Sequence, residues 1–249
     1  MVEAGCLDGV DEVYGFHNMP NFDEGDIRVC SGGFFAASTT IKIKIKGQGG
    51  HGSTPYKLQD PISAACAIYQ ALHTVMSRNV DSRQNCVFSI CHLTAGHTHN
   101  VYPDEATMQG TVRTYDEATK ERIIKRVQTI CENIASSMEC RAEVEIIRKY
   151  PAVVNHETET SHIKRLATKW FGPEHFSEDD LPITASEDFS YFLQAKPGCF
   201  FTLGTMKPGS KPRTLHTSDY DFNDDLVATG GYFWVRLVED RLNVKILNS

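Results

Sequence analysis

The sequence predicts an α/β protein in which an α/β layer domain is interrupted by an inserted ferredoxin-like module. Residues 39–150 follow the order β-α-β-β-α-β, which is the ferredoxin-like split unit. The flanking segments alternate short apolar strands with helices, but neither is complete alone. We therefore divide the chain into a first part of the α/β domain (1–38), the inserted module (39–152) and a second part (153–249).

The first half of the inserted module is a predicted strand followed by a helix. Residues 39–46 alternate apolar or small side chains with polar ones, which is typical of a strand with one buried face. Asp60 is a favourable N-cap, and Pro61 suits the first position of a helix. The buried stripe of this helix is predicted from helical spacing to contain Ile62, Ala65, Cys66, Tyr69, Leu72 and Met76.

The second half of the module contains two predicted strands, a long helix and a closing strand. The strands cover residues 85–91 and 106–114 and are joined by a polar loop that contains Pro103. Asp116 is the expected N-cap of the helix, and residues 141–149 form the last strand. The apolar side of this helix is predicted to contain Ile123, Ile124, Val127, Ile130, Cys131, Ile134 and Met138.

Arg113 is predicted to lie on the open face of the inserted sheet. On its strand, Met108 and Val112 take the parity that faces the helices, whereas Arg113 takes the opposite parity. A guanidinium on an uncovered sheet face is a suitable bidentate partner for a carboxylate. The alternative is an ordinary solvated arginine on a strand.

The flanking segments contain four further predicted elements. Residues 158–171 form a helix that Gly172 ends, and Ser186 is expected to cap a short helix that continues to Leu193. Residues 199–203 form a brief buried strand, and residues 224–242 form a C-terminal helix.

Composition excludes several classes of protein. The chain carries 25 basic and 32 acidic residues, a net charge of -7, and no basic cluster that would follow a phosphate backbone. It has no apolar run long enough to cross a membrane and no signal peptide. We expect a soluble, cytoplasmic protein without a nucleic-acid or membrane partner, although a targeting signal could be lost with a missing N-terminus.

The eight cysteines show no Cys-x-x-Cys pair and no zinc-finger spacing. Cys66 and Cys131 fall on the apolar stripes of the two predicted helices. Buried free thiols in a reducing compartment are therefore expected, in preference to disulfides.

Two histidines have settings that suit metal binding. His17 follows an apolar stretch at an expected strand end, and His216 opens an acid-rich loop before a helix. Loops at strand ends are where α/β folds gather their sites, and a neutral imidazole is a good ligand for zinc, cobalt or manganese. Any histidine taken alone is more often a surface or core residue. His51, between two glycines, is equally well interpreted as a loop residue or as a group that polarises a carbonyl.

Several short motifs in a fixed order resemble one enzyme family. Each motif alone is weakly specific, but their order and spacing are together specific and cover nearly the whole chain. The chain is similar to the aminoacylase, hippurate hydrolase and indole-acetyl-amino-acid hydrolase family of two-metal amidohydrolases. The motifs are residues 3–11, 14–17, 50–52, 98–105, 110–114, 186–189 and 216–224.

The resemblance implies an α/β metallohydrolase domain with two divalent metals (zinc, manganese or cobalt), and a lid module that often forms dimers. His17 and His216 would be metal ligands. His51 would polarise the scissile carbonyl, in many relatives from the partner subunit. Asn100 and Arg113 match lid positions that bind the substrate carboxylate and the reacting carbonyl.

Glu187 and Asp188 follow Ser186 at a predicted helix start, where the helix dipole favours acidic residues in any protein. The resemblance places this segment beside the active site. It implies a role in the substrate loop or in supporting the metal ligands.

One departure from the family pattern concerns the start of the chain. No Cys-x-His-Asp segment and no Glu-Glu-Gly segment precedes His17. In the family these segments supply metal ligands and the general base. We therefore expect an incomplete α/β domain with incomplete metal occupancy, impaired activity and an exposed sheet edge.

Three functions are consistent with the sequence. The first is a metal-dependent amidohydrolase that cleaves N-acyl amino acids or related conjugates, impaired in this form and able to form a homodimer through the lid. The second is a non-catalytic relative that dimerises or binds acyl amino acids. The third, an amino-acid-sensing module, leaves His17 and His216 unexplained.

Overall fold

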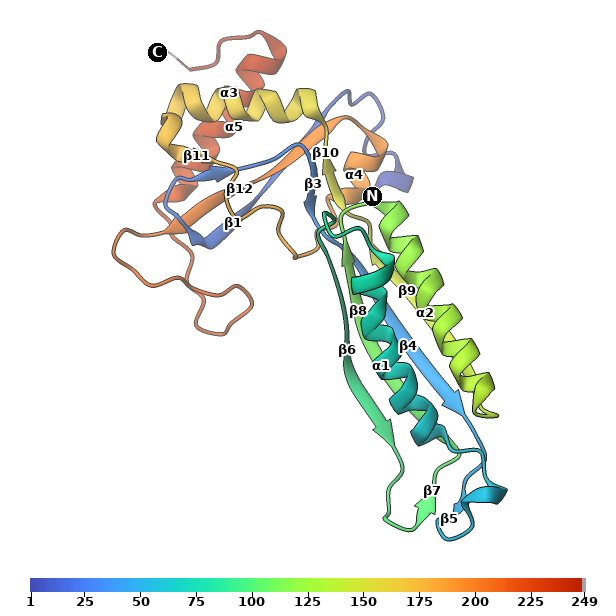
Figure 1. Ribbon diagram of the computed structural model, residues 1–249. Helices are drawn as coiled ribbons and strands as arrows, with labels where there is room; N and C mark the ends of the chain where they lie inside the picture. Colours follow the sequence, from blue (N-terminus) through green and yellow to red (C-terminus); the bar gives the residue numbers. More distant parts are fainter. Residues whose placement is uncertain (248–249) are drawn as a thin grey trace. The chain divides into compact units, whose positions relative to one another are not determined.

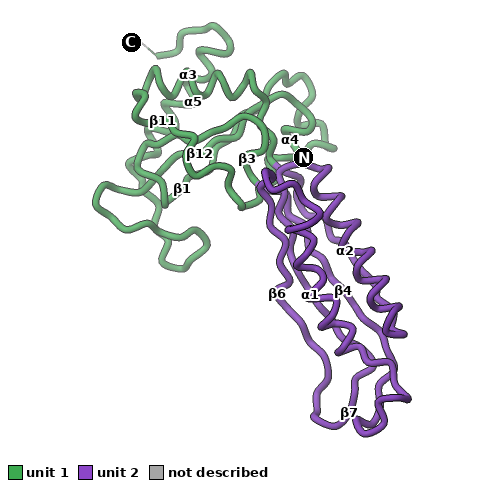
Figure 2. Tube along the Cα trace, in the orientation of Figure 1, with its two compact units in different colours: residues 1–35, 153–249 green, residues 36–152 purple. Residues whose placement is uncertain are grey.

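The computed structural model describes residues 1–247 of the chain. The fold divides into two compact units, which Figure 2 shows in different colours. The first unit contains residues 1–35 and 153–249, and the second contains residues 36–152.

The second unit is a four-stranded antiparallel sheet with two helices on one face (Figure 1). The strand order β6-β8-β4-β9 places the first and third strands of the motif at the centre, as in ferredoxin-like folds. The predicted β-α-β-β-α-β module is confirmed. Its elements are β4 (Ala37–Lys46), α1 (Pro61–Asn79), β6 (Cys86–Ala95), β8 (Glu105–Thr114), α2 (Glu117–Ser137) and β9 (Arg141–Tyr150), with the smaller β5 (Gly50–His51), η2 (Pro55–Lys57) and β7 (Val101–Tyr102).

Side-chain alternation places one continuous core between this sheet and its helices. Ile41, Ile43 and Ile45 of β4 are fully buried beneath α1 and α2. On β8, Val112 is buried while Arg113 is half-buried on the opposite parity, as predicted. Both predicted helix caps are present. The Asp60 carboxylate accepts from the N–H of Ile62 at 2.8 Å, and the Asp116 carboxylate accepts from that of Thr119 at 2.8 Å.

The buried stripe of α1 differs from the predicted one. Cys66 and Tyr69 are exposed, whereas Ala64 and Ile68 are fully buried. The apolar pattern of α1 is wider than the surface that the sheet and α2 cover, so helical spacing alone misplaces the stripe. On α2 the predicted positions Ile123, Ile124, Val127 and Cys131 are buried, and Ile130 and Ile134 are partly buried against the same core. Met138 lies beyond the helix and is exposed.

The first unit has a mixed sheet in the order β1-β12-β2-β11, with β1 and β12 parallel. A separate antiparallel pair joins β3 to β10. The core contains Phe201 and Leu203 of β12, packed with Phe233 of α5. The elements are η1 (Val2–Ala4), β1 (Val13–Asp23), β2 (Ile27–Arg28), β3 (Gly32–Phe35), β10 (Val153–Asn155), α3 (Glu157–Phe171), η3 (Pro173–His175), β11 (Phe176–Ser177), α4 (Ser190–Ala195), β12 (Gly198–Met206) and α5 (Leu226–Leu242).

Two local predictions for this unit are wrong. His17 is in the middle of β1 and not at its end, because β1 continues to Asp23. The strand tolerates Pro20, which lacks an N–H, because the β1–β12 pairing is irregular between Met19 and Asp23. Ser186 does not cap a helix, since α4 begins at Ser190 with no side-chain cap. The predicted strand 199–203 and C-terminal helix 224–242 exist with shifted ends.

All eight cysteines are free thiols. Cys131, Cys140 and Cys199 are buried, so the prediction holds for Cys131. It is wrong for Cys66, which is exposed on the outer side of α1. Among the described residues, no helix combines the length and the apolar character that a membrane crossing requires.

Candidate functional site

Side chains from distant parts of the first unit line one pocket of about 400 Å³. His17 comes from β1, Glu187 from the turn before α4, and His216 from the long loop before α5. Strand pairing and loop contacts bring together residues from both ends of the chain. The pocket is therefore a product of tertiary folding and not of a local motif.

The ring of His17 is held so that one nitrogen remains free. Its Nδ1 lies 2.7 Å from the carbonyl oxygen of Asn18. A carbonyl oxygen can only accept, so Nδ1 carries the proton and Nε2 presents its lone pair. Histidine ligands of metals are commonly fixed through the second nitrogen in this way.

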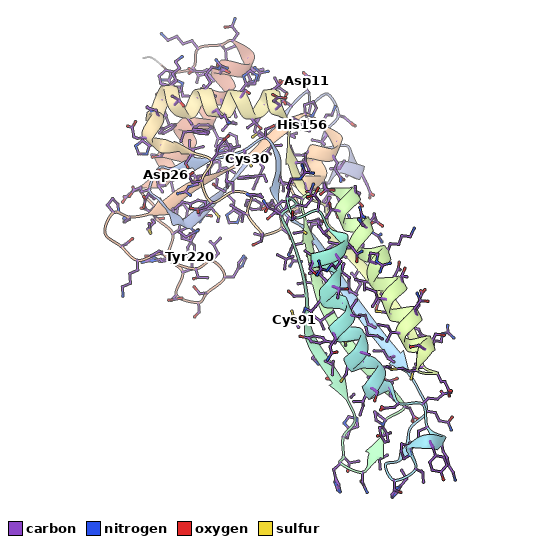
Figure 3. The ribbon with its side chains drawn as sticks, viewed as in Figure 1. Asp11, Asp26, Cys30, Cys91, His156 and Tyr220 are labelled. Carbon is purple, nitrogen blue, oxygen red and sulfur yellow. The ribbon has the colours of Figure 1, made fainter. Side chains whose placement is uncertain are left out.

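The loop that carries His216 is tied to β1 by two contacts. The side-chain amide of Asn18 donates to the hydroxyl of Tyr220, which Figure 3 labels on this loop, at 2.5 Å. The backbone N–H of Arg213 donates to the carbonyl of Pro20 at 3.4 Å. His216 itself has a φ of 64°, in the left-handed region that costs a non-glycine residue about 1 kcal/mol or more. Such a backbone position is often retained where it places a functional side chain.

Glu187 occupies a tight turn on the pocket wall. Its carbonyl accepts from the hydroxyl of Ser190 at 2.7 Å, and its carboxylate accepts from the N–H of Phe189 at 3.3 Å. Burial, followed by a hydrogen bond with Asp188, raises the pKa of Glu187, and a positive charge on His17, when its ring is protonated, opposes this rise. Glu187 lines the pocket, whereas Asp188 is exposed behind it.

The donor types in this pocket suit a transition metal. Imidazole nitrogen and carboxylate oxygen are ligands that zinc, manganese and cobalt accept. His17 and His216 offer two such nitrogens, and the free Nε2 of His17 is the form that a ligand requires. Within residues 1–247, no group of three or more His, Cys, Asp or Glu side chains converges into a ready ligand set. The residues that line the pocket would thus supply part of the coordination shell of such a metal.

A second pair of predicted residues meets at one end of the inserted unit. His51 on β5 is paired with Val101 on β7, and the N–H of Gly52 donates to the carbonyl of Asn100 at 2.8 Å. The N–H of Ser53 donates to Nδ1 of His51 at 3.2 Å, so the ring proton is on Nε2. His51 therefore presents a donor, whereas His17 presents an acceptor.

Glycine is required beside His51 because two backbones approach closely there. A Cβ on Gly49 would lie 2.3 Å from the carbonyl oxygen of Tyr102, far inside contact distance. Gly49 therefore has a structural reason that is independent of any catalytic role for His51.

Arg113 lies far from His51 and Asn100 within one chain. The β4–β8 ladder pairs Lys46 with Glu105 at the end nearest His51, and Ser38 with Arg113 near the other. Arg113 lies eight positions after Glu105 along β8, which corresponds to roughly 26 Å. The guanidinium of Arg113 donates to the hydroxyl of Thr111 and to the carbonyl of Val112.

Sequence reasoning missed one residue that lines the first unit's pocket, Arg213, and one that supports the loop carrying His216, Tyr220. Arg213 lines the pocket and forms an ion pair with Asp221 at 3.1 Å. Tyr220 connects the loop to β1 through Asn18. An aromatic residue within an acid-rich loop was the available signal for Tyr220, and nothing local distinguished Arg213.

Comparison with known proteins identifies the inserted unit. Residues 37–139 match the peptidase dimerisation domain. The chain is 32% identical over 239 residues to hippurate hydrolase of Campylobacter jejuni. This alignment covers 95% of this chain and 61% of that protein. It is 34% identical over 233 residues to N-acetyl-L-cysteine deacetylase of Bacillus subtilis. That alignment covers 94% of this chain and 54% of that protein.

Among solved structures, a dinuclear metal binding peptidase from the M20 family of Bacillus subtilis aligns with a TM-score of 0.79 and 26% identity. The alignment covers 98% of this chain and 61% of that chain. The chain thus spans about three fifths or less of the length of these relatives.

Proposed function

Because the chain belongs to the M20 peptidase family, we propose that it is part of a metal-dependent amidohydrolase acting on N-acyl amino acids or related amino-acid conjugates. The names of its relatives describe hydrolysis of hippurate and removal of acetyl from N-acetylcysteine. The observation that carries the proposal is the single pocket that His17, Glu187 and His216 line. The activity is proposed for a whole protein of the length of these relatives. This chain corresponds to a part of such a protein.

In this proposal the first unit binds the metals. His17 through Nε2 and His216 each supply one nitrogen ligand, and zinc, manganese or cobalt are the metals we expect, two in a complete site. Such metals, when bound, polarise a carbonyl and lower the pKa of a bound water. Asn18 and Tyr220 keep the His216 loop against β1.

Glu187 and Asp188 support the site from the substrate loop. The raised pKa of Glu187 makes its carboxyl group readier to hold a proton near the pocket than an exposed glutamate would be. We propose that Glu187 contacts the substrate or a metal ligand, while Asp188 positions it through their hydrogen bond.

The inserted unit is proposed to act on the substrate carbonyl and carboxylate. The Nε2–H of His51, with Asn100 beside it, would donate to the reacting carbonyl, and the guanidinium of Arg113 would bind the carboxylate. A substrate as small as an N-acyl amino acid cannot reach both ends of a strand that separates them by roughly 26 Å. His51 and Arg113 of one chain therefore serve different active sites, which requires a homodimer.

Eight free thiols are consistent with a reducing compartment, so the proposal places the protein in the cytoplasm.

Metal content and amino-acid release test the proposal. Purified protein is loaded with zinc, manganese or cobalt and dialysed, and bound metal is measured by mass spectrometry. Release of amino acid from N-acetyl and N-benzoyl substrates is followed in parallel. His17→Ala and His216→Ala are expected to lose bound metal, whereas His97→Ala, an exposed histidine of the other unit, serves as the matched control.

Retention of all bound metal in both pocket variants would contradict the ligand roles of His17 and His216. Binding of an acylated amino acid by the whole metal-loaded protein without release of the amino acid would instead indicate a non-catalytic binding protein.

A further inference from the structure

The ring of His51 is exposed, so few contacts decide its orientation. His51 ends the two-residue strand β5, which pairs with β7 (Figure 1). A neutral imidazole has two tautomers, with the proton on Nδ1 or on Nε2, and the hydrogen bond at one nitrogen decides which tautomer is present. The group that contacts Nδ1 of His51 therefore decides whether Nε2 donates or accepts.

Among the residues that the structure describes, both hydrogen bonds of this ring come from Ser53. The N–H of Ser53 donates to Nδ1 at 3.2 Å, and its hydroxyl oxygen lies 2.7 Å from the same nitrogen. A backbone N–H can only donate, so Nδ1 is an acceptor and the hydroxyl also donates to it. The hydroxyl forms the shorter of the two bonds. The ring proton is thus left on Nε2.

The turn that carries Ser53 is itself held in place. The N–H of Gly52 donates to the carbonyl of Asn100 at 2.8 Å, and the N–H of Thr54 donates to the carbonyl of His51 at 3.0 Å. The hydroxyl of Thr54 donates to that same carbonyl at 3.2 Å. The N–H groups on both sides of Ser53 are therefore fixed, which keeps the Ser53 hydroxyl within reach of the ring.

The contacts of His51 are the reverse of those of His17. The ring of His17 is held by the carbonyl oxygen of Asn18, which accepts and therefore places the proton on Nδ1. The ring of His51 is held by Ser53, which donates and therefore places the proton on Nε2. A free acceptor nitrogen suits a metal ligand, whereas a free N–H suits a partner for a carbonyl oxygen.

We propose that Ser53 is the positioning residue of His51, and that its hydroxyl holds the ring in the Nε2–H tautomer. A ring held in this way can donate from Nε2 to the carbonyl oxygen of an acyl amino acid while negative charge develops on that oxygen. With the proton on Nδ1, Nε2 would offer that oxygen a lone pair and no proton. The inference rests on the proposed function for the use of Nε2, but the tautomer itself is measured without substrate.

The tautomer is read from two-bond proton–nitrogen correlation spectra of the full chain, labelled with nitrogen-15 in histidine, at about pH 9, where imidazoles in general are neutral. His51→Gln identifies the His51 signals among those of the ten histidines. The wild type is expected to show the Nε2–H tautomer. Ser53→Ala keeps the N–H and loses the hydroxyl, so the share of the Nδ1–H tautomer should rise by roughly fivefold, the equivalent of one hydrogen bond.

Two further variants separate the role of the hydroxyl from the integrity of the turn. Ser53→Thr keeps a hydroxyl and is expected to give the wild-type spectrum. Thr54→Val is the matched control, because it removes the neighbouring hydroxyl, which binds the backbone of His51 and not its ring. Its His51 signals should be unchanged. Hydrogen exchange of the Gly52 N–H, which is bonded to Asn100, shows in each variant whether the turn is intact.

A wild-type ring with its proton on Nδ1 would overturn the proposal. An unchanged spectrum in Ser53→Ala, or an equal change in Thr54→Val, would overturn it as well.

Amino-acid release by the metal-loaded protein gives a second readout. Ser53→Ala is expected to lower kcat by roughly fivefold and to leave KM near the wild-type value, because the bond from Nε2 strengthens in the transition state. Ser53→Thr should restore kcat. A wild-type kcat in Ser53→Ala beside an altered spectrum would count against the positioning role. Absence of turnover in the wild type would instead contradict the proposed function, and the spectra would still decide the role of Ser53.

Discussion

The two units of this protein are built from the chain in different ways, because one is a continuous segment and the other joins two distant segments. In residues 36–152 one uninterrupted segment of the chain forms the whole sheet and both helices, and one core lies between them. In the other unit β1 pairs with β12, about 185 residues later, and the pocket unites His17 with His216. The continuous segment forms a self-contained scaffold, whereas the unit built from two distant segments brings His17 and His216, the proposed metal ligands, to one pocket.

The largest expected effect is on the core of the unit built from distant segments. Phe201→Ala removes a ring that is 1% exposed and packs against Phe16, Phe233 and Trp234. We expect it to cost about 3–5 kcal/mol of unfolding free energy. Hydrogen exchange should show lost protection in that unit, while the inserted unit keeps its protection. Phe222→Ala, at an exposed ring, is the control. Equal loss in both units would show that they unfold together.

The next effect concerns the end of the inserted unit that carries His51. Gly49→Ala would place a Cβ 2.3 Å from the Tyr102 carbonyl oxygen, so one backbone must move. We expect a cost of about 1–3 kcal/mol and faster hydrogen exchange in residues 50–53. Gly231→Ala, on α5 with open space around it, is the control and should stabilise by up to about 1 kcal/mol. Unchanged exchange in Gly49→Ala would contradict the close approach.

An ion pair in the first unit should make stability depend on acid. Two hydrogen bonds from Arg241 hold the pKa of Glu12 at about 2, below its usual 4.5, and Tyr14 donates to the same carboxylate. A lowered carboxyl pKa stabilises the fold above pH 4.5, and this contribution disappears as the pH falls towards 2. We expect wild type to lose about 1–2 kcal/mol more than Arg241→Gln over that interval in denaturant titrations. Parallel stability curves would contradict this.

The smallest expected effect is at the loop that carries His216. Tyr220→Phe removes the hydroxyl that accepts from Asn18, at a cost of about 1 kcal/mol. Zinc titration calorimetry should show weaker binding, since the loop is less firmly held. Tyr56→Phe, at an exposed tyrosine of the other unit, is the control. Unchanged zinc affinity would mean that other contacts position His216.

The same comparison explains what the sequence could predict. Alternation along residues 39–46 and the caps at Asp60 and Asp116 are local signals, and the structure confirms each. The face of α1 was misplaced because burial depends on which neighbours cover a helix, and periodicity does not record that. The extent of β1 beyond His17 was missed because pairing with β12 maintains the strand through a proline.

The candidate site could be predicted only through the resemblance to a family. No periodicity relates His17 to His216, and their place in one pocket depends on the pairing of distant strands. Their roles as ligands stay a prediction, as do those of His51, Asn100 and Arg113. Arg213 entered the pocket wall through a backbone contact with Pro20, which leaves no trace in the local sequence.

The pairing of β3 with β10 has a consequence for how such a chain can be modified. Phe35 and Val153 are paired in register, so the chain leaves the first unit and returns to it at two neighbouring points of the same strand pair. A tight turn of a few residues could close that gap. Residues 36–152 could therefore be excised, or exchanged for another module with closely spaced ends, without re-threading the rest of the polypeptide.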